Sequence, residues 1–159
     1  MSVRFGFSCA LLLLCGCGSS SVCGPTTGDV ENVVDGDTIQ LTTGEKIRYL
    51  LVDTPEITNG HNDCYGAEAR DFNRSLVDAK TVSLQYDEAQ CKDRFGRLLA
   101  YVSVDGHEVN KLLVERGFAC VLSIPPAGDA RKDEFLSTQT TAKSEGRGVW
   151  GFCDPVPCQ

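Results

Sequence analysis

The chain has 159 residues, with 22 acidic and 15 basic side chains and a formal charge of −7 at pH 7. This length suits one domain with its own hydrophobic core and is too short for two. The acidic balance argues against binding to nucleic acid through a broad basic face, which normally supplies most of the affinity, so any such activity requires a local site.

The N-terminal segment has the layout of a secretory signal. In residues 1–16, MSVRFGFSCALLLLCG, Arg4 precedes an apolar run that is too short to span a bilayer as a mature helix. The run ends in LCGC, which resembles the bacterial lipobox, and that resemblance implies a lipid anchor on Cys17. We therefore expect a protein that is lipid-anchored in the bacterial cell envelope, on its periplasmic or outer side. Ordinary signal cleavage with a secreted product is the alternative.

A tether is expected after the anchor. Residues 17–28 are small, polar and Gly-rich and lack the apolar residues that build a core. Removal of residues 1–16 takes away one basic group, so the balance becomes 14 basic against 22 acidic groups, or −8. We predict a folded domain over residues 29–153 and a C-terminal tail over residues 154–159.

From residue 29 onward the sequence has the pattern of an α+β domain. Short apolar segments alternate with turn signals such as Asp35-Gly36 and Asp105-Gly106, which predicts five strands, at 30–34, 38–41, 47–52, 81–86 and 97–104. Apolar residues at helical spacing and glycines at helix ends predict three helices, at 65–79, 108–117 and 129–145. This element order is typical of a small barrel with helices added late.

Six of the nine cysteines follow the expected signal: Cys23, Cys64, Cys91, Cys120, Cys153 and Cys158. An even number in an exported chain favours up to three disulfides. Zinc binding is the alternative, but the chain has no C-x-x-C pair, and His61 and His107 are far apart in the sequence.

Carboxylates gather in two predicted loops. The stretch VVDGDT contains Asp35 and Asp37, and RYLLVDTPE places Asp53 and Glu56 where Pro55 ends a strand. If the first and third strands lie side by side, these loops meet, and crowded carboxylates need a cation or shifted pKa values. Oxygen ligands suit a hard ion, which favours calcium. Acids after a strand are also common as turn and cap residues, and we interpret Asp35 in that way.

Two arginines begin strands near these acids. Arg48 opens RYLLV, and Arg97 opens RLLAYV after the turn KDRFG. A guanidinium group binds two phosphate oxygens at once, so two arginines beside a metal ion and carboxylates suit an electrophilic site for a phosphodiester. Taken singly, either arginine is explained by a surface ion pair.

Four motifs in order, VVDGDT, RYLLVDTPE, YGAEA and DRFGRLLAYV, resemble those of the staphylococcal nuclease (thermonuclease) family. The resemblance covers residues 29 to about 152. It implies an α+β fold, an OB-fold five-stranded β-barrel with three α-helices, which agrees with the element order above. It also implies a monomeric nuclease, without a protein partner, that acts on single-stranded or frayed DNA and RNA.

The resemblance implies a role for each matching residue. Asp37 and Asp53 would bind Ca²⁺ through their carboxylates, and Thr54 would bind it through its backbone carbonyl. Glu56 would be the general base that activates water. The catalytic arginines, Arg48 and Arg97, would bind the scissile phosphate and stabilise the five-coordinate transition state.

The sequence also departs from the family pattern. Arg94 and Phe95 stand where the family often has Lys or Arg and Tyr; Arg94 can bind a phosphate, and Phe95 can stack on a base but cannot donate a hydrogen bond. The segment CVLSIPPAG, with Ser123 and Pro125, stands where the family usually offers Tyr residues to the nucleotide. We therefore expect an active enzyme with a raised KM.

The cysteine positions and the family resemblance together lead us to expect two pairings. Cys64 and Cys91 would tie the loop after Glu56 to the arginine turn. Cys120 and Cys153 would pair where the family packs its last helix against the barrel. Cys23 and Cys158 would then bond to each other or remain free, although six cysteines allow fifteen full connectivities.

Two other classes of protein fit parts of the sequence. A catalytically silent nuclease-like module would bind nucleic acid or protein, but such relatives usually lack the set of acids and arginines present here. A structural envelope lipoprotein would explain the tether and the cysteines, but it leaves the placement of the acids and arginines unexplained. The sequence therefore favours a calcium-dependent nuclease.

Overall fold

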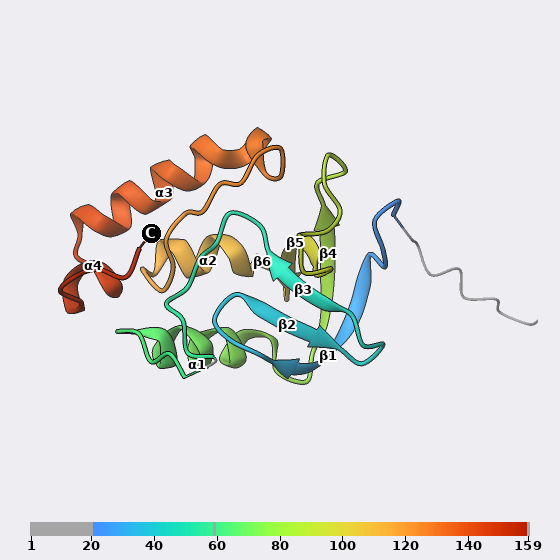
Figure 1. Ribbon diagram of the computed structural model, residues 1–159, viewed down its shortest axis with the longest axis horizontal. Helices are drawn as coiled ribbons and strands as arrows, with labels where there is room; N and C mark the ends of the chain where they lie inside the picture. The colour runs from blue at the N-terminus through green and yellow to red at the C-terminus, as the bar shows by residue number, and fades with distance from the viewer. Residues whose placement is uncertain (1–20, 59, 159) are drawn as a thin grey trace, which may run out of the picture.

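The computed structural model describes residues 21–58 and 60–158, so the expected signal segment with Cys17 lies outside the described residues. Strands pair in the order β3-β2-β1-β4-β5-β6, and a parallel pairing of β3 with β5 closes the first five into a barrel (Figure 1). The strands are β1 (Thr27–Val33), β2 (Thr38–Leu41), β3 (Lys46–Tyr49), β4 (Thr81–Tyr86), β5 (Leu98–Val104) and β6 (His107–Glu108). The predicted five-stranded barrel is confirmed, with the two-residue β6 as an addition.

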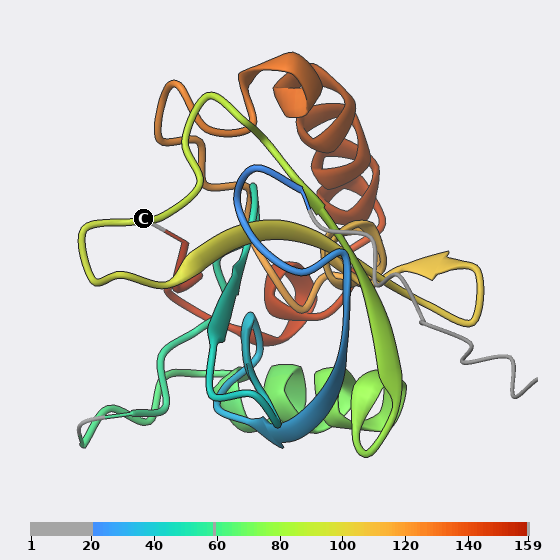
Figure 2. The same cartoon turned by 90° about the vertical axis from the view of Figure 1, so that its right-hand side faces the viewer.

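Three main helices pack on this barrel, as predicted. The helices are α1 (Gly66–Val77), α2 (Val109–Glu115), α3 (Lys132–Ser144) and the short α4 (Val149–Phe152), with a 3-10 turn, η1 (Asp129–Arg131), before α3. In both views α1 and α3 lie on opposite sides of the molecule, and α2 contacts both of them and β5 (Figure 1, Figure 2). In the part of the chain that the structure describes, no helix is long and apolar enough to cross a membrane.

The barrel interior is filled by side chains from alternate strand positions. Ile39 and Leu41 of β2, Ile47 of β3, Val82 of β4 and Val102 of β5 are all fully buried. Alternation of this kind directs one face of each strand inward and leaves the other face and the loops for polar residues. The core therefore supplies a rigid scaffold for the loops described below.

The third strand is shorter than predicted. β3 ends at Tyr49 rather than at residue 52, because Leu51 has a left-handed backbone with φ of 60°, which interrupts extended pairing. Asn110 of α2 donates its side-chain amide to the carbonyl of Leu50 at 2.9 Å. Leu50, Leu51 and Val52 are nevertheless buried. The apolar run therefore reflects burial of a turn rather than a longer strand.

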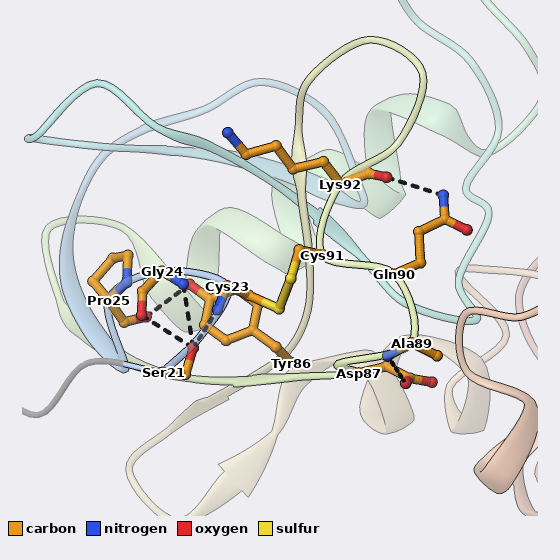
Figure 3. Close-up of a disulfide and its surroundings, with 10 residues drawn as sticks. All are labelled: Ser21, Cys23, Gly24, Pro25, Tyr86, Asp87, Ala89, Gln90, Cys91 and Lys92. Atoms are coloured by element: carbon orange, nitrogen blue, oxygen red, sulfur yellow. Dashed lines mark hydrogen bonds between the residues drawn. A yellow bond between two sulfur atoms is a disulfide. The ribbon is translucent and has the colours of Figure 1, made fainter.

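Residues 21–28, expected to form a tether, belong to the folded unit. Cys23 is disulfide-bonded to Cys91, and the carbonyl of Pro25 accepts a hydrogen bond from the hydroxyl of Tyr86 at 2.7 Å (Figure 3). Strand β1 also begins within this segment. Composition does not reveal this packing, because the segment is held by a covalent bond and hydrogen bonds rather than by apolar side chains.

Candidate active site

One cavity of about 490 Å³ is lined by the residues that the sequence predicts for the functional site. It is lined by the turn between β1 and β2, the loop after β3, the turn before β5 and the segment 122–127. All eight residues predicted to bind metal, catalyse or contact substrate line it: Asp37, Arg48, Asp53, Thr54, Glu56, Arg94, Phe95 and Arg97. Residues up to 60 positions apart in sequence, from 37 to 97, therefore meet in one place.

Arg48 lies between two carboxylates. Its Nη1 is 3.2 Å from Oδ1 of Asp37, and its Nη2 is 3.0 Å from Oδ1 of Asp53. Nη1 also donates to the backbone carbonyls of Tyr49, at 3.1 Å, and Val52. The side chain is only 12 % exposed, so these ion pairs are weakly screened and hold the guanidinium in one orientation.

Asp37 joins the two acid-rich loops. Its Oδ2 accepts hydrogen bonds from the backbone N–H of Thr54 at 2.8 Å and from the Thr54 hydroxyl at 3.0 Å. The two loops do meet, but the first and third strands are not neighbours, which was the condition on which the sequence predicted that contact. Instead β2 lies between β1 and β3, and the contact is made by these side chain–backbone bonds. Asp37 is 5 % exposed, and these hydrogen bonds hold its carboxylate against Thr54.

Glu56 accepts hydrogen bonds from the start of its own loop. Its Oε1 accepts the backbone N–H groups of Ile57, at 2.9 Å, and Thr58, at 2.7 Å. Partial burial raises the pKa of this carboxyl, but the hydrogen bonds from Thr58 and Ile57 outweigh burial and hold the pKa below its usual value. Glu56 is therefore an ionised carboxylate at neutral pH, the form that a general base requires.

Arg97 is oriented by Asp93, a residue that our sequence interpretation overlooked. Oδ2 of Asp93 accepts a hydrogen bond from Nε of Arg97 at 2.7 Å. Phe95 lies 68 % exposed in the same turn, with the guanidinium carbons of Arg94 and Arg97 at 4.7 and 5.5 Å from its ring centroid. These contacts present two cations and one aromatic face to the cavity.

Two partly buried carboxyls at the cavity have raised pKa values. Burial, together with the neighbouring Asp37 carboxylate, raises the pKa of Asp35 to about 7. Burial also raises the pKa of Asp53, and Arg48 opposes that effect. Asp35 does act as a turn residue, since its Oδ1 accepts the backbone N–H of Asp37 at 3.0 Å. The cavity is therefore a place where added positive charge is stabilised.

The donors present fit a calcium ion. In residues 21–58 and 60–158, no three His, Cys, Asp or Glu side chains are arranged to hold a metal by themselves. The predicted ligands comprise two carboxylates, on Asp37 and Asp53, and the carbonyl oxygen of Thr54, all at the cavity. Calcium takes six to eight oxygen ligands, commonly including water, so a partial set of hard oxygens suits it when solvent or a phosphate completes the shell.

All six cysteines after the signal form disulfides, but the expected pairings are wrong. The bonds join Cys23 to Cys91, Cys64 to Cys153 and Cys120 to Cys158. The folded N-terminal segment brings Cys23 to Cys91, as Figure 3 shows. Stacking of Tyr65 on Phe152, with ring centroids 5.6 Å apart, draws Cys64 to Cys153. Cys120 is left for the C-terminal tail, which packs back against the cluster around it.

Each disulfide is attached to a loop of the cavity. The carbonyl of Cys91 accepts the N–H of Leu99 at 2.9 Å, at the base of the turn that carries Arg97. Cys120 and Asp53 exchange two backbone hydrogen bonds, of 2.8 and 2.9 Å. Cys64 follows directly after Asp63, whose backbone N–H donates to the carbonyl of Glu56 at 2.9 Å. The covalent bonds therefore brace the turn before β5 and, at two points, the loop after β3.

Comparison with known proteins identifies the class to which this fold and cavity belong. A family model described as "Staphylococcal nuclease homologue" matches residues 46–151. The "SPbeta prophage-derived endonuclease YokF" and the "Endonuclease YncB" of Bacillus subtilis (strain 168) are each 39 % identical to the chain over 127 residues, which is 76 % of this chain and 43 % and 60 % of those two proteins. An "Uncharacterized endonuclease" of Escherichia coli O157:H7 is 36 % identical over 141 residues, 86 % of this chain and 84 % of that protein.

The chain belongs to the staphylococcal nuclease family. It spans less than two thirds of the length of the two Bacillus subtilis relatives.

Proposed function

We propose that the protein is a calcium-dependent nuclease of the bacterial cell envelope, which hydrolyses phosphodiester bonds in single-stranded or frayed DNA and RNA as a monomer. The observation that carries this proposal is the convergence of two arginines and three carboxylates on one cavity: Asp37, Arg48, Asp53, Glu56 and Arg97. The family assignment, and relatives whose names describe them as endonucleases, support nuclease activity.

The side chains of the cavity can perform the chemistry of hydrolysis. Arg48 and Arg97 bind non-bridging phosphate oxygens, whose negative charge is concentrated as a fifth oxygen approaches phosphorus. Glu56 accepts a proton from the attacking water, a role for which its lowered pKa keeps it ionised. The bond from phosphorus to the sugar oxygen opposite the attacking water then breaks, and that oxygen takes a proton from solvent. Because Arg48 and Arg97 are already oriented by Asp53 and Asp93, little reorganisation is needed.

Calcium bound by Asp37, Asp53 and the carbonyl of Thr54 would supply a Lewis acid beside the phosphate. Asp37 and Asp53 meanwhile set the position of Arg48, to which both are paired. Removal of one positioned electrostatic stabiliser of this kind typically lowers kcat by about a hundredfold to a thousandfold.

Substrate contacts outside the reacting phosphate are expected to be mainly apolar. Phe95 offers an exposed ring on which a base can stack, and Arg94 beside it can bind a phosphate. Leu122 and Ile124 line the cavity in the segment where the family usually has Tyr. These side chains can pack against a base but cannot donate hydrogen bonds, which supports a raised KM with an intact catalytic set.

An anchor on Cys17 would hold the domain close to the membrane. Cys17 lies outside the described residues, and its lipidation rests on the LCGC motif. The folded unit includes Ser21, which is four residues after Cys17. A chain spans at most about 3.5 Å per residue, so the domain would lie within about 14 Å of the lipid attachment.

Cleavage of single-stranded DNA by the purified mature protein tests the activity. We expect cleavage with millimolar calcium and none with an excess of chelator. Fluorescence anisotropy of the same labelled DNA measures binding in parallel. If the protein binds DNA but does not cleave it at any calcium concentration, the protein is a nuclease-like binding module instead.

A further inference from the structure

A buried pair of hydrogen-bonded polar side chains is attached to the acid-rich turn of the cavity. Asn73 of α1 and Tyr49 at the end of β3 are 0 % and 1 % exposed. The Tyr49 hydroxyl donates to Oδ1 of Asn73 at 2.9 Å. Nδ2 of Asn73 then donates to the backbone carbonyl of Asp35 at 3.1 Å. The pair therefore connects a helix and a strand to the first residue of the turn that carries Asp37.

The same turn is also attached to the main chain of Tyr49. The backbone N–H of Tyr49 donates to the backbone carbonyl of Asp37 at 2.9 Å. The turn is thus held at Asp35 by the side chain of Asn73 and at Asp37 by the backbone of Tyr49. The Asp37 carboxylate, in contrast, faces Thr54 and Arg48. Asn73 holds the backbone of the turn at Asp35, and the Asp37 carboxylate extends from the same turn toward Thr54 and Arg48. Asn73 can therefore control where the Asp37 carboxylate lies.

Asn73 lowers the stability of the fold unless its side-chain amide is hydrogen-bonded. Asn is a poorer helix former than the aliphatic residues that normally fill a buried helix face, and burying an amide without partners is unfavourable. Neighbouring buried positions on α1 are apolar or small, including Ala69 and Val77. The amide oxygen of Asn73 accepts from Tyr49, and its nitrogen donates to Asp35. These hydrogen bonds offset the free-energy cost of burying the amide only when the turn lies in this position.

We propose that Asn73, oriented by the Tyr49 hydroxyl, is a positioning residue that sets the Asp35–Asp37 turn for calcium binding, an inference that rests on the proposed function. Groups that orient metal ligands without touching the metal commonly change its affinity by about tenfold to a hundredfold. Asn73 is not among the residues that line the cavity, so it acts on the ion through the turn and makes no direct contact with substrate.

Calcium titration by calorimetry tests this role without relying on activity. For Asn73→Ala we expect the calcium Kd to rise about tenfold. For Tyr49→Phe, which keeps the ring and removes only the hydroxyl, we expect a smaller rise of about threefold, since Asn73 keeps its bond to Asp35 but loses its orienting partner. At saturating calcium, kcat of both variants should stay within about twofold of the parent, because the bound ion restores the ligand position.

A matched control removes a different tyrosine hydroxyl. Tyr86→Phe deletes the hydrogen bond to the carbonyl of Pro25, which lies on the N-terminal segment and not on the acid-rich turn. Its calcium Kd should equal that of the parent even if its thermal midpoint falls. The double variant Asn73→Ala/Tyr49→Phe should bind calcium no more weakly than Asn73→Ala alone, because both changes act through one hydrogen-bonded chain.

The outcomes separate this inference from the proposed function. A parent protein that binds calcium and cleaves DNA, with unchanged calcium Kd in Asn73→Ala and Tyr49→Phe, overturns the positioning role and leaves the nuclease intact. A parent that neither binds calcium nor cleaves DNA overturns both. If Asn73→Ala does not fold, the calcium Kd of Tyr49→Phe decides: a value equal to the parent's rejects the inference, and a raised value supports it.

Discussion

The carboxylate of Asp93 holds Arg97 by both its side chain and its backbone. Oδ2 accepts the side-chain Nε–H at 2.7 Å, and Oδ1 accepts the backbone N–H of Arg97 at 3.0 Å and that of Phe95 at 2.9 Å. Asp93 therefore stabilises the turn through two backbone hydrogen bonds and orients the guanidinium of Arg97.

Replacement of Asp93 should impair catalysis because it releases the guanidinium of Arg97. In Asp93→Asn one of the two acceptor oxygens becomes an NH₂ group, which cannot accept from either nitrogen of Arg97. We expect kcat on single-stranded DNA to fall about tenfold, as orienting partners of catalytic groups commonly contribute that much. Asp71→Asn is the control, because Asp71 pairs with Arg70 on the exposed face of α1. Equal kcat in Asp93→Asn and the parent would show that Arg97 orients itself.

The same pair should make the protein sensitive to acid. Burial raises the pKa of Asp93, but the hydrogen bonds and charge of Arg97 outweigh burial and hold the pKa below its usual 3.8. A carboxyl with a depressed pKa contributes stability above its unfolded pKa and loses that contribution as the pH falls through the folded value. Urea unfolding should therefore show that the free energy of unfolding falls more between pH 5 and pH 2.5 in the parent than in Asp93→Asn. Parallel losses contradict the assignment.

Glu56→Gln should separate catalysis from folding. The Gln carbonyl oxygen can still accept the N–H groups of Ile57 and Thr58, so the loop is retained, but the amide cannot take a proton from water. We expect kcat to fall by at least about a hundredfold and the thermal midpoint to change by less than about 2 °C. Glu68→Gln on α1 provides a matched exchange at an exposed position. Near-parent turnover in Glu56→Gln rejects Glu56 as the base.

The disulfides can be checked by peptide mapping without reduction. We expect three linked fragments, joining Cys23 to Cys91, Cys64 to Cys153 and Cys120 to Cys158. Replacing both members of the second pair by Ser should lower the free energy of unfolding by about 4 kcal/mol, because that bond closes a long loop of the unfolded chain. A linked fragment that joins Cys64 to Cys91 contradicts the connectivity.

Cys17→Ser tests the envelope anchor. Lipid attachment requires the thiol, so the variant should leave the membrane fraction or remain as an unprocessed precursor. Immunoblots of membrane and soluble fractions provide the measurement, with Cys15→Ser as the matched control in the same segment. An unlipidated N-terminus downstream of Cys17, found by mass spectrometry of the parent, would mean a secreted or periplasmic protein.

Local patterns in the sequence were sufficient for the class of fold. Alternating apolar residues with Asp-Gly turns predict strands, and glycines at helix ends predict helices, because these depend on neighbours within a few residues. The barrel, the three main helices and the gathering of Asp37, Arg48, Asp53, Glu56 and Arg97 were all anticipated, the last through motifs whose spacing resembles that of the family. The length of β3 was not, because apolar residues in a buried turn look the same as those in a strand.

Only the tertiary structure decided the contacts between distant residues. The disulfide partners depend on which segments pack together, and neither the folded N-terminal segment at Cys23 nor the returning tail at Cys158 leaves a periodic signal in the sequence. The role of Asn73 is similar: the sequence places a polar residue on an apolar helix face, but its partner at Asp35 lies 38 positions away. Chain topology determines which residues far apart in the sequence form hydrogen bonds and disulfides. Residue chemistry within a few positions determines which segments are apolar and where turns form.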